Sequence, residues 1–392
     1  MRLHAWFRGW LLVSVALADP AFVGTASNGS LVLRPAEGQQ VLIAGTDFRS
    51  LVENLDKLET QLAQQLANRQ CVITADTTTV TGLNGNGKWA GGVLAGNHKI
   101  YGIPYSSRAV LIIDPTTNTA DTTTIADLSS GGAKWHGGVL AGNGKIYGIP
   151  HRSTSVLIID PTTNTADTTA MAALDGDGKW AEGVLAGNGK IYGIPFHSAS
   201  VLIIDPTTNA TDITTITGLS GGGKWAGGVL AGNGKIYSIP VSTTSVLIID
   251  PTTNTADTTT ITGFSGSSQW AGGVLAGNGK IYGMPHNSAS VLIIDPTTNT
   301  TDTTTITGLS LDVFKWQGGV LAGNGKIYGI PASSTSVLVI DPTVDTADNS
   351  SIAVNGGSLT WKGGALAGNG KIYGMPHNSP SVLIIKRDCA RL

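Results

Sequence analysis

A tryptophan returns at a nearly fixed interval along most of the chain, and this repeat limits the fold more than any other feature. The seven positions are Trp89, Trp135, Trp180, Trp225, Trp270, Trp316 and Trp361, and neighbours lie 45 or 46 residues apart. Each tryptophan begins a nearly identical unit. A fixed period of this length is typical of proteins that repeat one supersecondary unit around or along an axis.

One unit, KWHGGVLAGNGKIYGIPHRSTSVLIIDPTTNTADTTAMA from Lys134 to Ala172, predicts four strands. Strand a is WHGGVLA, strand b is KIYGIP, strand c is SVLIID and strand d is ADTTA. The Asn143-Gly144 pair suits a tight hairpin turn between a and b. The unbroken apolar run of strand c predicts burial on both faces, and the polar threonines of strand d predict an outer edge. Only 13% of the residues are charged, as expected for short strands and tight turns.

The strand count predicts a closed ring. Strands a, b and c occur seven times, but the last unit ends at SVLIIK, residues 381–386, without a strand d. A matching segment, VITADTTTVT at residues 72–81, stands before the first unit. We therefore predict an all-β fold, a seven-bladed β-propeller with four antiparallel strands per blade, in which the N-terminal strand closes the last blade. Paired glycines on strand a would relieve crowding at the central axis.

The two cysteines flank this closure. In the register of the repeat, Cys71 and Cys389 correspond to adjacent positions of one c–d turn. Chain ends that meet there would bring the sulfurs within disulfide reach, and a crosslink over so long a loop would stabilise the fold by about 5 kcal/mol. The alternative is two free thiols.

The motifs GKIYGIP and SVLIIDPTTNT resemble the core of kelch repeats and equally the YVTN-type propeller repeat. The resemblance covers residues 71–392. It departs from kelch where Ile-Pro stands in place of a glycine doublet, and no tryptophan follows the Asp-Pro turn. The resemblance implies the propeller fold and leaves activity open, because both kinds of propeller host unrelated functions.

Three segments precede the propeller. Residues 1–18 have a basic start, the apolar run Trp10–Ala18 and a small-x-small site, which predicts a signal peptide and export; the alternative is a membrane-anchored or merely hydrophobic N-terminus. Residues 19–47 predict a short β-rich segment. Residues 48–70 predict a short helix with a heptad seam, Phe48, Leu51, Leu55, Leu58 and Leu62, which would form a homo-oligomer or else pack on the propeller. We expect no membrane span in the mature protein.

Function is expected where the repeats differ. The acids that end strand c, such as Asp114, Asp160, Asp205, Asp250, Asp295 and Asp341, are predicted to accept hydrogen bonds within turns rather than to bind metal. The d–a loop with the residue after tryptophan, and the b–c loop, vary, and both emerge on one face. The predicted binding residues on that face are Tyr105, Arg108, His136, His151, Arg152, Phe196, His197, His286, Gln317 and His377. Neutral drift of exposed loops is the alternative.

No catalytic pattern emerges from the sequence. The loop carboxylates Asp127, Asp175, Asp177, Glu182 and Asp312 suggest no acid–base pair, and His151, His286 and His377 are interpreted as exposed loop histidines rather than zinc ligands. No cofactor or metal is expected. The net charge of −2, with no basic cluster, argues against nucleic acid as a partner.

The leading hypothesis is a secreted scaffold that binds an extracellular protein or glycan. The rivals are a polysaccharide hydrolase or lyase and a structural cell-surface or fibre component. Sequons at Asn28, Asn209, Asn299 and Asn349 are candidate glycosylation sites, unless they are chance matches in a threonine-rich chain.

Overall fold

The computed structural model describes residues 71–389 without a gap, with only the backbone at Cys71 and Cys389. Before residue 71 it describes residues 57–58, which are helical, and the backbones of six short strands: β1 (Arg2–Phe7), β2 (Leu11–Ala16), β3 (Phe22–Thr25), β4 (Leu31–Arg34), β5 (Leu42–Ile43) and β6 (Thr46–Asp47). The chain divides into two compact units, one of residues 1–72 with 388–392 and one of residues 73–387.

The smaller unit contains two antiparallel sheets. One has the strand order β1-β2-β5-β6 and the other pairs β3 with β4. Strands thus occupy part of the segment predicted to be β-rich, and β1 and β2 lie within the predicted signal peptide. Most of the predicted heptad helix, residues 48–70, lies outside the described residues, as does Asn28. Signal cleavage and self-association stay predictions.

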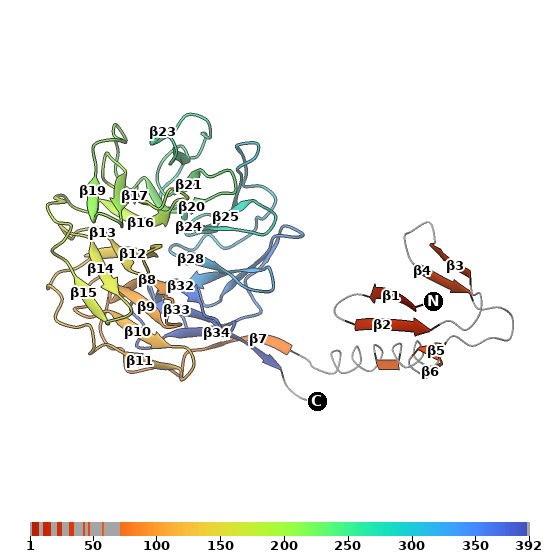
Figure 1. Ribbon diagram of the computed structural model, residues 1–392. Helices are drawn as coiled ribbons and strands as arrows, with labels where there is room; N and C mark the ends of the chain where they lie inside the picture. The colour runs from red at the N-terminus through yellow and green to blue at the C-terminus, as the bar shows by residue number, and fades with distance from the viewer. Residues whose placement is uncertain are drawn as a thin grey trace. The chain divides into compact units, whose positions relative to one another are not determined.

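The larger unit contains seven four-stranded antiparallel sheets, arranged as blades around a common axis (Figure 1). The blade that begins at Trp135 has the order β12 (Trp135–Leu140), β13 (Ile146–Pro150), β14 (Leu157–Asp160) and β15 (Thr165–Asp167). These are strands a to d of the predicted unit. The seven-bladed fold is therefore confirmed.

The other blades repeat this order. Blade 1 is β8 (Trp89–Leu94), β9 (Ile100–Pro104), β10 (Leu111–Asp114) and β11 (Thr119–Asp121); blade 3 is β16 (Trp180–Leu185), β17 (Ile191–Pro195), β18 (Leu202–Asp205) and β19 (Ala210–Asp212); blade 4 is β20 (Trp225–Leu230), β21 (Ile236–Pro240), β22 (Leu247–Asp250) and β23 (Thr255–Asp257); blade 5 is β24 (Trp270–Leu275), β25 (Ile281–Pro285), β26 (Leu292–Asp295) and β27 (Thr300–Asp302); blade 6 is β28 (Trp316–Leu321), β29 (Ile327–Pro331), β30 (Leu338–Asp341) and β31 (Thr346–Asp348).

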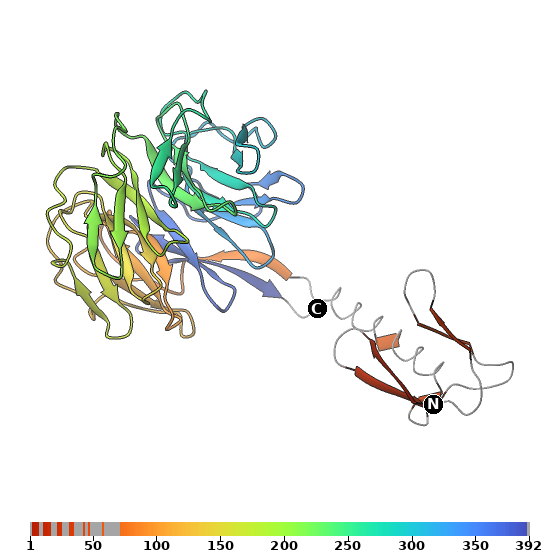
Figure 2. The same cartoon turned by 45° about the horizontal axis from the view of Figure 1, so that its top comes forward.

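Blade 7 is completed by the strand that precedes blade 1. Its order is β32 (Trp361–Leu366), β33 (Ile372–Pro376), β34 (Leu383–Cys389) and β7 (Cys71–Asp76). β7 and β34 lie side by side in both views (Figure 1, Figure 2), and Lys386 Nζ lies 3.6 Å from Asp76 Oδ2. The predicted closure is thus confirmed. The cysteine side chains lie outside the described residues, so the disulfide stays a prediction.

The core consists of layers between neighbouring blades. In one layer Tyr147 and Ile158 of blade 2 pack with Trp180 and Ile191 of blade 3. Leu157, Ile158 and the next residue of strand c are all buried, as the unbroken apolar run predicted. Strand b is equally buried along its whole length. Each blade therefore stabilises both of its neighbours.

Glycine is required on strand a because the innermost strands nearly touch. Gly137 has φ of +77°, and a Cβ added at Gly91 would lie 3.0 Å from the Gly137 Cα. A β-bulge between Trp135 and Gly138 accommodates this turn of the backbone. The predicted role of the glycine doublet, to remove side chains near the axis, is confirmed.

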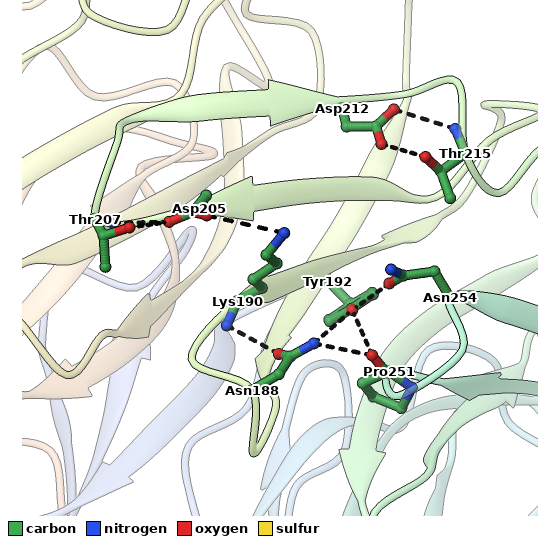
Figure 3. Close-up of polar contacts among 9 residues, drawn as sticks. All are labelled: Asn188, Lys190, Tyr192, Asp205, Thr207, Asp212, Thr215, Pro251 and Asn254. Carbon is green, nitrogen blue, oxygen red and sulfur yellow. Dashed lines mark hydrogen bonds and ion pairs between the residues drawn. The ribbon is translucent and has the colours of Figure 1, made fainter.

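At most boundaries a hydrogen-bonded latch joins one blade to the c–d turn of the next. Figure 3 shows the one between blades 3 and 4. Tyr192 Oη donates to Asn254 Oδ1 at 2.6 Å, and Asn188 Nδ2 donates to Tyr192 Oη and to the Pro251 carbonyl, each at 3.0 Å. The Tyr192 side chain is fully buried, so the bonds satisfy a hydroxyl group that burial would otherwise leave unpaired.

The latch recurs at six of the seven blade boundaries, with Tyr101, Tyr147, Tyr192, Tyr237, Tyr282 and Tyr373 as its tyrosines. At Tyr282 the acceptor is a carboxylate, Asp345, which together with burial raises the tyrosine pKa. Tyr328 of blade 6 is bonded only to Asn324 among the residues that the structure describes. Its neighbour, blade 7, has no c–d turn, because the chain ends meet there.

The acids after strand c accept hydrogen bonds from their own turns, as predicted. Asp205 Oδ1 accepts from the Thr207 backbone N–H at 3.0 Å, and Lys190 Nζ lies 3.8 Å from the same carboxylate (Figure 3). A second acid, Asp212, bonds Thr215 in the turn after strand d. These carboxylates therefore stabilise turns. No described helix is both long and apolar enough to cross a membrane.

Candidate functional site

The axis of the propeller contains a narrow cavity of about 140 Å³. Its lining is the glycine doublets of five blades, with one carboxylate and one glycine from blade 3: Gly91, Gly92, Gly137, Gly138, Glu182, Gly183, Gly272, Gly273, Gly318, Gly319, Gly363 and Gly364. A space of this size holds a few water molecules. A larger ligand would have to bind over its mouth.

Aromatic and histidine side chains from three blades meet beside this cavity. The Tyr105 ring centroid lies 5.9 Å from that of His136, 6.2 Å from His151 and 5.2 Å from His377. Phe196 extends the group, 5.7 Å from His151. His136 directly precedes Gly137, which lines the cavity. We call these five residues, with Lys362 and Glu182 described below, the axial cluster.

Lys362 supplies the positive charge of the axial cluster. Its Nζ lies 4.7 Å from the Tyr105 ring centroid, within the range of a cation–π interaction. No carboxylate of residues 72–388 lies within 4.0 Å of this ammonium group. Burial lowers its pKa to about 8, and the attraction of Glu182 partly opposes this shift. Lys362 occupies the position after tryptophan in blade 7, as His136 does in blade 2.

Glu182 supplies the negative charge of the axial cluster and lies deeper than Lys362. It stands where the other six units have the first glycine of the doublet, and it adopts φ of +66°, which a residue with a Cβ rarely does. Its side chain lines the axial cavity. Burial raises the pKa of its carboxyl, and Lys362 acts in the opposite direction. Strained residues in unusual backbone conformations are often found at functional sites.

The histidines are buried, which corrects the interpretation as exposed loop residues. His151, His286 and His377 are only 9%, 8% and 6% exposed. Burial is the main reason that the pKa of each falls to about 4, with Lys362 adding to the shift. They are buried because the b–c loop folds inward against the next blade rather than into solvent. At neutral pH all three rings are uncharged.

Two of these histidines have a defined tautomer. His151 Nδ1 lies 2.9 Å from the Trp180 carbonyl and His377 Nδ1 lies 3.0 Å from the Trp89 carbonyl. Since a carbonyl only accepts, Nδ1 carries the proton and Nε2 of each neutral ring is an acceptor. By contrast, His136 Nδ1 and both ring nitrogens of His286 are buried without a hydrogen-bond partner among the described residues.

Buried lysines anchor the loops that carry the histidines. Lys179 Nζ donates to the carbonyls of Gly176, Ser153 and His151 at 2.8 to 3.2 Å, and Lys88 Nζ donates to the His377 carbonyl at 3.0 Å. Each ammonium also lies 5.8 Å from the ring centroid of the tryptophan that follows it. These lysines precede the repeat tryptophan and hold the b–c loop of the preceding blade in place.

Four of the predicted binding residues are not members of the axial cluster, although one of them contacts its edge. Arg108 and Arg152 are exposed and form ion pairs with Asp127 (3.7 Å) and Asp177 (2.6 Å). His197 packs edge-on against Phe196 and accepts a hydrogen bond from the Gly223 backbone. Gln317 is half-buried on β28.

The remaining prediction, His286, belongs to blade 5. Its ring lies 4.9 Å from that of Phe314, and it interacts electrostatically with Lys362. Within the described residues no group of three or more His, Cys, Asp or Glu side chains is placed to hold a metal ion.

The other side of the ring is apolar. Ala181, Ala226 and Val241 form a small buried cluster, and Phe196 packs against it. All four residues occupy the same repeat positions that carry His136 and His151 elsewhere. The mouth of the cavity is therefore divided into a polar half, from blades 7, 1 and 2, and an apolar half, from blades 3 and 4.

Sequence reasoning did not assign a role to Lys362 or Glu182. The signals were present: Glu182 is the one break in seven glycine doublets, and Lys362 is the one cation among the seven residues that follow the repeat tryptophan. Both lie on strand a rather than in a variable loop.

The sequons of the c–d turns lie on the propeller surface. Asn209 and Asn299 are exposed, and their Oδ1 atoms accept hydrogen bonds from Tyr147 and Tyr237. Asn349 is also exposed. Glycosylation at these positions stays a prediction.

No family model and no curated protein sequence matches the chain. Solved structures do match. A streptogramin B lyase has a TM-score of 0.60 at 9% identity, covering 81% of this chain and 98% of its own. A hydrazine synthase from Kuenenia stuttgartiensis has a TM-score of 0.60 at 14% identity, covering 77% of this chain and 96% of its own. The extracellular domain of a hybrid two-component system from B. thetaiotaomicron has a TM-score of 0.56 at 9% identity, covering 77% of this chain and 40% of its own.

These similarities concern the fold, since enzymes and a sensor domain share it at such low identity. The kelch-like or YVTN-like character of the repeat stays a prediction. Function has to be argued from the site itself.

Proposed function

We propose that this chain is an extracellular binding protein that takes its ligand on the face formed by the d–a and b–c loops, with the axial cluster at the centre of contact. The observation that carries the proposal is the contrast between blades. Turns, latches and core repeat almost unchanged, whereas the residue after tryptophan and the first residue of the b–c loop differ and converge on one point. A uniform scaffold with one variable face is typical of binding platforms.

The chemistry of the cluster suits a ligand better than it suits stability. A half-buried ammonium without a close carboxylate, and the buried His136 Nδ1 without a partner among the described residues, each destabilise a folded protein. Such groups are expected where a bound molecule supplies the missing partners. Extracellular location is supported by the pattern of residues 1–18 and by a structural neighbour that is itself an extracellular domain.

The test is a screen of the purified protein on glycan and surface-protein arrays, followed by variants. Tyr105→Ala should weaken binding by about tenfold or more, as central aromatic contacts do. Arg108→Ala, on the same face but outside the axial cluster, should change affinity less than about threefold. A further variant, Lys362→Gln, removes the charge of the axial cluster. Its matched control is Lys371→Gln, in the a–b turn at the other end of the blade. Equal effects of central and peripheral variants would contradict the proposal.

A second candidate is an enzyme that acts on a polysaccharide. The observation in its favour is the pair Glu182 and Lys362, whose pKa values burial shifts towards neutrality from opposite sides, as in acid–base sites. Incubation of the array ligands with the protein distinguishes the two: turnover that disappears in Glu182→Gln favours the enzyme. Silence in both binding and turnover favours the structural component.

A further inference from the structure

The strongest clue to the kind of ligand is the combination of groups that the axial cluster leaves unsatisfied. Lys362 Nζ is a cation that lies over the Tyr105 ring. No carboxylate of residues 72–388 lies within 4.0 Å of it. Its natural partner is an anionic group that enters the mouth of the cavity, because a charge-assisted hydrogen bond to a carboxylate is stronger than a neutral one. Glu182 lies deeper and would repel a second anion, so the site has room for one.

Two histidines of the axial cluster present hydrogen-bond acceptors. The Nε2 atoms of His151 and His377 are acceptors, because their Nδ1–H groups are already committed to the Trp180 and Trp89 carbonyls. A carboxylate, sulfate or phosphate only accepts hydrogen bonds and cannot satisfy an acceptor. A ligand that uses these acceptors therefore carries hydrogen-bond donors, such as hydroxyl groups, beside its negative charge.

The walls of the site add a third requirement. The Tyr105 ring stands among three histidine rings at centroid distances of 5.2 to 6.2 Å, and Phe196 faces the apolar half with Ala226 and Val241. Such walls favour a compact ligand with an apolar face. The axial cavity of about 140 Å³ admits water rather than a ring, so the ligand lies across its mouth.

Resting on the proposed function, we infer that the axial cluster recognises an acidic sugar of the uronic acid class. Its carboxylate pairs with Lys362, its hydroxyl groups donate to Nε2 of His151 and His377, and the C–H face of its ring packs on Tyr105. The other macromolecular partner, an acidic peptide, offers the carboxylate but not a group of hydroxyl donors beside it.

Calorimetric titration with defined probes tests this inference. The probes are oligosaccharides of galacturonate and of glucuronate, the same oligosaccharides with their carboxyl groups reduced to hydroxymethyl, and an oligoglutamate peptide. We expect the acidic oligosaccharides to bind, and reduction of the carboxyl groups to weaken binding by about tenfold or more. The peptide should not compete.

Variants identify the contact. Lys362→Gln should bind the acidic sugars about tenfold or more weakly and should no longer distinguish acidic from reduced sugars. Lys371→Gln should behave as the wild type. Lys362→Arg, which keeps the charge, should retain the preference for the acidic form. His377→Phe should weaken acidic and reduced sugars alike, because it removes an acceptor for hydroxyl groups. Circular dichroism and the melting temperature of each variant report whether it is folded.

The outcomes separate the two proposals. Equal binding of acidic and reduced sugars, or a preference for the peptide that depends on Tyr105, would overturn the acidic-sugar inference and leave the binding function standing. If neither these probes nor the array ligands bind to the intact protein, both are overturned.

Discussion

The ammonium group of Lys362 lies over the ring of Tyr105, 4.7 Å from its centroid. Lys362 belongs to blade 7 and Tyr105 follows the second strand of blade 1, so the contact joins the last blade to the first. The polar half of the axial cluster thus forms only when the last blade stands beside the first. Closure is therefore a condition for the site as well as for stability.

The first prediction concerns the stability cost of Lys362. Its pKa in the folded state, about 8, is below the ordinary 10.5, so the charged form is disfavoured by folding. Lys362→Met should raise the free energy of unfolding at pH 7 by about 1–2 kcal/mol, after allowing for the lost cation–π contact. Because the wild-type lysine loses its proton in the folded state first, the gain should shrink between pH 8 and 10.5. Urea titrations across this range measure it, and a loss of stability at pH 7 would contradict it.

The second prediction concerns acid. The pKa of His377 is about 4 in the folded protein, below its ordinary value of 6.5, so the unfolded chain binds the proton first as the pH falls. Stability should decrease from pH 6.5 to pH 4 by up to about 3 kcal/mol for this residue. His377→Asn, which does not titrate, should show a shallower decrease over the same window. The titratable groups that face His377 are His136, Tyr105, Lys362 and Lys88, and the two lysines and the tyrosine keep their protons throughout this window. Identical slopes would argue against it.

The third prediction compares a blade boundary that has a latch with the one boundary, among the described residues, that has none. Tyr192→Phe removes the donor to Asn254 and should lower the free energy of unfolding by about 1–2 kcal/mol. Tyr328→Phe is the matched control, because this hydroxyl is bonded only to Asn324 among the described residues, and its loss should cost less than half as much. Chemical denaturation of both variants gives the comparison. Equal losses would show that the latch does not stabilise the boundary.

The fourth prediction concerns a turn. His98 adopts φ of +64° at a position where the other six units have glycine. The left-handed conformation strains a residue with a Cβ, so His98→Gly should raise the free energy of unfolding by about 0.5–1 kcal/mol. Gly144→Ala, the reverse change at the equivalent turn, should lower it by a similar amount. Thermal melts of the two variants should shift in opposite directions.

The fifth prediction concerns the clasp between the ends of the propeller. β7 begins at Cys71 and its neighbour β34 ends at Cys389, at the boundary where Tyr328 finds no turn to bond. A peptide map of the unreduced protein should contain a Cys71–Cys389 linked pair, and reduction should lower the stability by up to about 5 kcal/mol. Two thiols that react with iodoacetamide in the unfolded, unreduced protein would rule out the crosslink.

The repeat made the fold predictable because every blade has the same sequence pattern. Seven copies of the tryptophan, the Asn-Gly turn and the Asp-Pro turn fixed the strand order, and the missing strand d identified the closing segment. The predicted end of the closing strand was less accurate. The strand was predicted at residues 72–81, but it ends at Asp76. The reason is that Asp76 accepts hydrogen bonds from Thr78 and Thr79, which turns the chain.

The candidate site was only partly predictable. Variation between copies singled out Tyr105, His136 and His151, which the structure brings together, and their role in binding stays a prediction. It could not show that the histidines are buried, because burial comes from the neighbouring blade and not from the loop itself. It also could not single out Lys362 or Glu182 as site residues. The two lie about 180 residues apart in sequence, and only the ring brings them to one axis.

The pairing of β7 with β34 has a consequence for synthesis. β7 is the first strand of the propeller to leave the ribosome, and its partner is the last, so the nascent chain carries an exposed strand edge throughout elongation. Such an edge is prone to pair with the wrong strand, and six nearly identical competitors follow it. We therefore expect the growing chain to depend on protection of this segment until release.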